Sequence, residues 1–119
     1  MKKKYRIKKY SEIDAVYRKR DAKNDSYFAV YQANDPEAKN FRFAMSIGTK
    51  YGNAVQRNLI KRRVRMIVSD LQDQFIINKL FLIVIRPKAK QLDYQEIKSK
   101  LTLLLKKSKL MENKNAKTL

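Results

Sequence analysis

The sequence predicts a single α+β domain with elements in the order α-β-β-α-β-α, in which a small mixed sheet is packed on one side by helices. Two observations support this prediction. Stretches with apolar residues at helical spacing alternate with short stretches rich in β-forming residues, and turn or capping residues separate them. The chain has 119 residues and is 44% hydrophobic, which suffices for one modest core, so we treat residues 1–119 as one domain.

The N-terminal part predicts a basic arm followed by a short helix. Residues 1–9 contain six cations and no acid, so we expect an arm that is flexible or ordered by RNA rather than a packed element. Ser11 and Asp14 have the spacing of a capping pair at the start of a helix, which should end near Arg20. The apolar face of this helix would consist of Ile13, Val16 and Tyr17.

Two short strands are predicted next. Residues 27–32 alternate along a strand, which places Phe28 and Val30 on one face, and we expect these two side chains in the core. Turn residues separate this strand from residues 42–47, so we expect the two strands to pair as a hairpin. The other face of the first strand would carry Tyr27, Ala29 and Tyr31.

The last third of the chain predicts a strand and a helix. Residues 80–85 are all aliphatic or aromatic, as in a strand that is buried on both faces. Asp93 and Glu96 have capping spacing at the start of a helix that runs to about residue 107. We expect the polar, lysine-rich residues 111–119 to be flexible.

The stretch from residue 53 to about residue 75 predicts the helix that bears most on function. Asn53 can cap its first turn and Gln56 can complete a capping box. Its apolar stripe consists of Ile60, Val64, Ile67 and Leu71. Beside the stripe lies a polar row, which we call the ridge, formed by Arg57, Asn58, Lys61, Arg62 and Arg65. No acid occurs between residues 42 and 65, so the clustered cations repel one another and indicate a polyanionic partner.

The charge of the whole chain favours the same class of partner. The net charge is +18, and residues 1–20, 42–65 and 86–119 each contribute +7. Nucleic acid is the partner that best fits such a surface. A membrane is disfavoured because the helix has only a minor second apolar strip, made of Val55, Leu59 and Met66. The basic start lacks the apolar segment of a signal peptide, so we expect a cytoplasmic protein.

The residue types present argue against catalysis by the protein itself. The chain contains no histidine and no cysteine, which removes the commonest general base, the thiolate nucleophile and every His/Cys metal site. Asp70 and Asp73 are the one close pair of acids on a helix, and their spacing is better explained by a solvated face than by a metal site. We therefore predict no catalytic residue and no metal ligand on the protein.

The residues around the ridge carry a resemblance to a known family. The pattern Gly-Asn-Ala-Val-x-Arg-Asn-x-x-Lys-Arg-x-x-Arg, which begins at Gly52 and ends at Arg65, resembles the signature of the protein subunit of bacterial ribonuclease P. The order of the surrounding elements also resembles that family over nearly the whole chain. One position departs from the pattern, because Leu59 stands where the family usually has a further arginine.

The resemblance implies a fold detail and a function. It implies a left-handed strand-helix-strand crossover, and a cleft between the first helix and the open face of the sheet. It also implies a holoenzyme that removes the 5′ leader of precursor tRNA by endonucleolytic cleavage. In this family the RNA subunit is the catalyst, and the RNA subunit and the substrate hold the Mg²⁺ ions. The implied partners are therefore the catalytic RNA and precursor tRNA, with no membrane and no obligate protein partner.

The resemblance assigns roles to particular residues. RNA contact falls on the ridge residues Arg57, Asn58, Lys61, Arg62 and Arg65. The single-stranded leader would lie in the cleft, lined by Ile13, Tyr17, Ala29 and Tyr31. Aromatic side chains in an electropositive groove suit unpaired nucleotides, because every base offers a face for stacking.

Other interpretations remain open at this stage. The spacing of Ile13, Val16 and Tyr17 is also that of an ordinary core stripe. A ribosomal or ribosome-assembly protein would use a similar basic surface on ribosomal RNA. A DNA-binding helix is a third possibility, which the absence of an evident partner helix just before residue 53 disfavours.

Overall fold

The computed structural model describes residues 2–112 of the chain. Within them the helices are α1 (Tyr10–Arg18), α2 (Ala54–Asp70) and α3 (Tyr94–Lys107). The strands are β1 (Ala22–Asn24), β2 (Phe28–Asn34), β3 (Arg42–Ile47) and β4 (Lys79–Ile85). Short 3-10 turns are η1 (Lys3–Tyr5), η2 (Thr49–Tyr51), η3 (Gln72–Gln74) and η4 (Pro87–Gln91). The predicted order α-β-β-α-β-α is thus confirmed with one addition, the short strand β1.

The four described strands form one mixed sheet in the order β1-β2-β4-β3. β4 lies between β2, with which it pairs antiparallel, and β3, with which it pairs parallel. The expected hairpin between β2 and β3 is therefore wrong. The run of apolar residues in β4 is buried on both faces and takes the centre of the sheet, where it has a neighbour at each edge.

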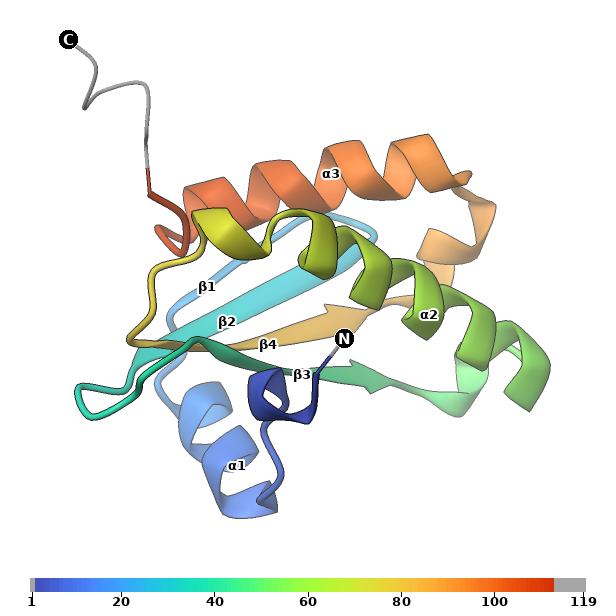
Figure 1. The fold of residues 1–119 in the computed structure, drawn as a ribbon. Coiled ribbons are helices and arrows are strands. Elements are labelled where there is room, and N and C mark those ends of the chain that lie inside the picture. Colours follow the sequence, from blue (N-terminus) through green and yellow to red (C-terminus); the bar gives the residue numbers. More distant parts are fainter. Residues whose placement is uncertain (1, 113–119) are drawn as a thin grey trace, which may run out of the picture.

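The connection from β3 through α2 to β4 is left-handed, as the family resemblance implied. In Figure 1, β3 lies nearest the viewer, β4 lies behind it, both point to the right, and α2 crosses above them. This hand is an exception to the usual rule for parallel strands. It places α2 over the face of the sheet that α3 also covers.

The helices cover the two faces of the sheet unequally. α2 and α3 lie together over one face, whereas α1 lies against the opposite face (Figure 1). The main core between α2, α3 and the sheet includes Phe28 and Val30, as predicted. A smaller cluster covers part of the second face, where Val16 of α1 and Ile7 of the N-terminal segment pack with Leu80 and Leu82. α2 and α3 thus pack on one side of the sheet as predicted, whereas α1 lies beside the opposite, open face, as the family resemblance implied.

The starts of α2 and α3 are fixed by complete capping boxes, as predicted. Asn53 Oδ1 accepts from the Gln56 amide at 2.9 Å, and Gln56 Oε1 accepts from the Asn53 amide at 3.0 Å. Asp93 and Glu96 make the same pair of bonds at the start of α3. The predicted cap at Ser11 is wrong, because α1 begins at Tyr10 and Ser11 lies inside its first turn.

Two chain segments that we expected to be flexible make packed contacts. Tyr5 stacks on Phe41 with ring centroids 4.7 Å apart, and the Ile7 amide donates to the Phe43 carbonyl at 3.0 Å. The first residues therefore do not form a free arm, because their apolar side chains cover the β3 edge of the core. At the other end Met111 pairs with Phe75, and residues 113–119 of the expected tail lie outside the described residues.

Candidate nucleic-acid interface

The ridge lies on the outward side of α2. Ile60, Val64 and Ile67 anchor the helix in the main core and are almost completely buried. At about 100° per residue the polar row beside this stripe must face away from the sheet. Asn58 and Arg62 are exposed, whereas the stems of Arg57, Lys61 and Arg65 are partly covered. The structure therefore brings the five predicted ridge residues together on one surface.

Arg57 is held at the start of the ridge by its own helix. Its Nη1 donates to the Gly52 carbonyl, which precedes the first turn of α2. A Cβ at Gly52 would lie 2.1 Å from Gln56 Oε1, so only glycine leaves room for the capping box at this place. Gly52, Asn53 and Gln56 thus fix the first turn of the helix, from which Arg57 and Asn58 project.

The ridge cations have no acidic partner among residues 2–112. The ion pairs of this described part of the chain join Arg42 to Glu12 and Asp35, and Lys98 to Asp70. Burial and then the nearby charges of Arg6 and Arg62 lower the pKa of Arg65 from its ordinary value. Crowded like charges of this kind are relieved when an anion binds beside them.

The cleft residues lie where α1 meets the open face of the sheet. The rings of Tyr17 and Tyr31 are 4.9 Å apart at 47°, and Tyr17 is 54% exposed. Ile13 is half-buried beside the second cluster of apolar side chains. Ala29 is only 1% exposed, so it supports the sheet and offers no surface to a ligand, which corrects its predicted place in the lining.

Tyr27 also departs from the predicted pattern. It precedes β2 and packs against the main core instead of sharing a face with Tyr31. The ammonium groups of Lys88 and Lys100 lie 5.3 and 4.8 Å from the centre of its ring. Its ring therefore holds two cations in place and takes no part in the cleft.

A hollow of about 330 Å³ lies where the N-terminal segment and α1 approach the β3 edge and α2. Its polar lining includes Arg6, Lys8, Tyr10 and the ridge residue Arg65, and Ile13 of the cleft belongs to the same lining. The hollow thus joins the two predicted surfaces. The sequence did not predict Arg6, Lys8 or Tyr10 as site residues, because these positions were assigned to a free arm and to the start of a helix.

The described residues offer no protein site for a metal ion. No group of three or more His, Cys, Asp or Glu side chains in residues 2–112 could hold one. The carboxylates of Glu12 and Asp35 are engaged by Arg42, and that of Asp70 by Lys98. A donor set for Mg²⁺ would need several free oxygen ligands in one place, which these residues do not provide.

A separate finding concerns membranes. Within residues 2–112, no helix combines the length and the apolar character that a membrane span requires.

The fold and this surface are those of a small nucleic-acid-binding α+β protein. The family model described as Ribonuclease P matches residues 1–109. The ribonuclease P protein component of Bacillus cereus is 42% identical over 108 residues, which cover 91% of this chain and 94% of that protein. The protein component from Acholeplasma laidlawii is also 42% identical, over 94% of this chain and 96% of that protein.

Solved structures agree with these matches. The ribonuclease P protein of Staphylococcus aureus superimposes with a TM-score of 0.85 at 32% identity, covering 91% of this chain and 98% of that one. The protein from Thermotoga maritima has the same fold, with a TM-score of 0.76 at 22% identity, over 86% of this chain and 96% of that one. The chain belongs to the ribonuclease P protein family. It is accordingly a component of an endoribonuclease that processes tRNA, and the ribosomal and DNA-binding alternatives are not favoured.

Proposed function

We propose that the chain serves ribonuclease P by binding RNA on two surfaces. The ridge on α2 binds the catalytic RNA subunit, and the cleft beside α1 binds the single-stranded 5′ leader of precursor tRNA. The observation that carries this proposal is a row of cations without acidic partners in the described chain, joined through one hollow to the exposed ring of Tyr17 beside the half-buried ring of Tyr31.

The ridge is suited to a folded RNA. Arg57, Lys61, Arg62 and Arg65 supply positive charges along one side of a rigid helix, and Asn58 adds an amide that both donates and accepts hydrogen bonds. The free amides at the start of α2 add a partial positive charge beside Arg57. A phosphate backbone that follows the helix can contact these groups in succession, releasing counterions at each contact.

The cleft is suited to an unpaired strand. Tyr17 presents an exposed ring beside Tyr31, so a base can stack there while its phosphate turns toward the basic hollow. The cations that line this hollow are Arg6, Lys8 and Arg65. The arrangement does not require a particular base, because the contacts are to ring faces and to phosphates.

The protein contributes charge and shape to the reaction and no reacting group. Its side chains include no histidine and no cysteine, and its described carboxylates provide no metal site. We place the Mg²⁺ ions on the RNA subunit and the substrate. The cations of the protein would lower the repulsion between the RNA subunit and precursor tRNA at their contact. We place this reaction in the cytoplasm.

The direct test compares cleavage of precursor tRNA by the RNA subunit at low Mg²⁺ with and without the full chain. We expect strong stimulation by the chain, and less stimulation when the precursor has no leader. If the chain gives no stimulation, it does not serve as the protein subunit. The RNA that co-purifies with the chain separates this function from ribosomal binding, since one RNA of moderate size is expected instead of ribosomal subunits.

A further inference from the structure

A strip of apolar side chains lies on the solvent-exposed side of α2, where it is not part of the core. Val55 is 77% exposed, Leu59 42% and Met66 52%. Their spacings of four and seven residues place them on one side of the helix, away from the buried stripe of Ile60 and Val64. We call these three residues the outer strip. Exposed single apolar residues are common, but three in a row on the surface that carries the ridge require an explanation.

Cations border the outer strip on both sides. At about 100° per residue, Lys61 and Arg65 lie along one side of it together with the neutral Asn58, and Arg63 lies along the other. Arg62 lies within the strip, between Leu59 and Met66. Any partner that covers the strip must therefore combine a dense negative charge with small apolar surfaces.

Two other binding partners, a second copy of the chain and a lipid surface, fit the outer strip and its bordering cations less well. A second copy of the chain would bring two sets of like charges together, and three part-exposed side chains fall far short of the roughly 1,200 Å² of a stable interface. A lipid surface requires an apolar face about 100° wide, whereas the outer strip is narrow and Arg62 interrupts it. RNA meets both requirements, because ribose and base surfaces lie directly beside its phosphates.

We infer that the outer strip contacts ribose and base surfaces of the RNA whose phosphates bind the ridge. This inference rests on the proposed function and adds a contribution that is independent of charge. Leu59 lies between Val55 and Met66 along the helix and is therefore the centre of the outer strip.

The two kinds of contact differ in their response to salt. Each phosphate contact adds about 0.7 to 0.9 to the slope of log affinity against log salt concentration. An apolar contact leaves that slope unchanged and multiplies affinity by about fourfold for each methylene buried. Salt titration therefore separates the outer strip from the ridge.

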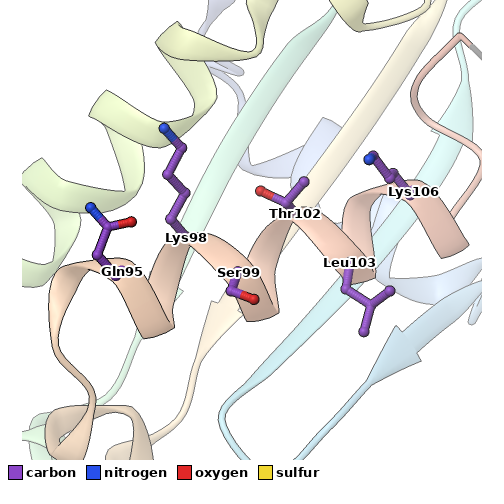
Figure 2. A pocket seen from close by; sticks show the side chains of 6 residues that line it. All are labelled: Gln95, Lys98, Ser99, Thr102, Leu103 and Lys106. Carbon is purple, nitrogen blue, oxygen red and sulfur yellow. The ribbon is translucent and has the colours of Figure 1, made fainter.

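The experiment measures binding of the full chain to ribonuclease P RNA transcribed in vitro, over a range of KCl concentrations. The test variant carries Leu59→Gln and Met66→Gln, which keep good helix propensity and remove apolar surface. Leu103→Gln is the matched control, since Leu103 is 54% exposed on another helix. Figure 2 shows that Lys98 extends toward α2, where it pairs with Asp70, whereas Leu103 points away from α2. Circular dichroism melting verifies that each variant is folded, and Leu59→Ala provides a second, smaller truncation.

We expect the double variant to bind about tenfold more weakly at every salt concentration, with an unchanged slope. Leu103→Gln should bind like the unmodified chain, and Lys61→Gln should reduce the slope. If the folded double variant binds as tightly as the unmodified chain, the outer strip does not contact RNA, although the ridge still does. If the unmodified chain does not bind the RNA, the proposed function fails and this inference fails with it.

Two further measurements address the other occupants. The same variants are tested for binding to phosphatidylglycerol vesicles and for self-association by sedimentation equilibrium. Loss of vesicle binding or of a dimer in the double variant, with RNA affinity unchanged, would overturn the inference in favour of that occupant. No difference in either measurement, together with the loss of RNA affinity, supports RNA as the occupant.

Discussion

Arg42 on β3 and Glu12 on α1 form a two-pronged ion pair, with Nη1–Oε1 and Nη2–Oε2 distances of 3.1 and 2.5 Å. The same guanidinium reaches Asp35 at 3.1 Å. The hydrogen bond to Glu12, together with the bond to Asp35 and both carboxylate charges, outweighs burial and raises the pKa of Arg42. This group of side chains ties the first turn of α1 to β3.

Replacement of Arg42 by alanine should therefore destabilise the fold. Planar, bidentate pairs are among the stronger surface ion pairs, and their loss also frees two carboxylates beside each other. We expect the free energy of unfolding to fall by about 1–3 kcal/mol, measured by urea denaturation. Lys50→Ala is the control, because Lys50 is exposed and forms no ion pair within residues 2–112. Equal stability of the two variants would show that Arg42 does not hold α1.

Gly52 and Gly48 provide a matched pair for testing the start of α2. An alanine Cβ at Gly52 would lie 2.1 Å from Gln56 Oε1, whereas nothing lies within 4 Å of a Cβ at Gly48. Gly52→Ala must therefore break the capping box, and we expect a loss of about 1–2 kcal/mol in the free energy of unfolding. Gly48→Ala should leave stability unchanged or slightly raised. Similar thermal melting of both variants would contradict this account of the capping box.

Local signals predicted the helices well, because the residues that decide a helix end lie next to it. Asn53 with Gln56 and Asp93 with Glu96 are four-residue patterns, and both form the expected boxes. β1 was missed because Ala22, Lys23 and Asn24 have no strand pattern of their own and pair only through β2. The hairpin between β2 and β3 was wrong because strand order depends on β4, which comes more than thirty residues after β3.

In the candidate site, too, local sequence patterns predicted some residues, whereas others come together only in the fold. Periodicity alone placed the five ridge residues on one side of α2. The family resemblance was needed to connect Tyr17 with Tyr31, because spacing alone favoured a core position for Tyr17. Arg6, Lys8 and Tyr10 were missed because only the packing of Tyr5 and Ile7 brings their segment beside Arg65. No pattern within residues 1–10 carries that information.

Tyr17→Ala should weaken binding of the leader without changing the ridge. Stacking of one base on an aromatic ring contributes about 1–3 kcal/mol, so we expect roughly 5- to 150-fold weaker binding of precursor tRNA by the holoenzyme. Affinity for mature tRNA should not change, since it has no leader. Tyr17→Phe keeps the ring and should restore binding. An equal loss for precursor and mature tRNA would show that Tyr17 supports the fold and not the leader.

Tyr51 should make stability depend on pH in the alkaline range. Burial raises the pKa of Tyr51, and the nearby charge of Arg63 opposes this only in part. A phenol with a higher pKa in the folded chain stabilises the fold below about pH 10, its unfolded pKa, and this stabilisation is lost as the pH rises further. We expect the unmodified chain to lose stability more steeply than Tyr51→Phe above pH 10, by urea denaturation at successive pH values. Parallel curves for the two proteins would contradict this prediction.

Leu59→Arg extends the row of cations on α2, and its predicted effect on RNA affinity changes sign with salt concentration. The added guanidinium should gain one phosphate contact, which steepens the salt dependence of RNA affinity by about 0.7 to 0.9. The same change removes the apolar contact that we infer for Leu59, and that loss does not depend on salt. The variant should therefore bind slightly more tightly than the unmodified chain at low salt and more weakly at high salt, so that the two titration lines cross. Tighter binding at every salt concentration would mean that Leu59 makes no apolar contact with RNA, while weaker binding with an unchanged slope would mean that no phosphate lies within reach of this position.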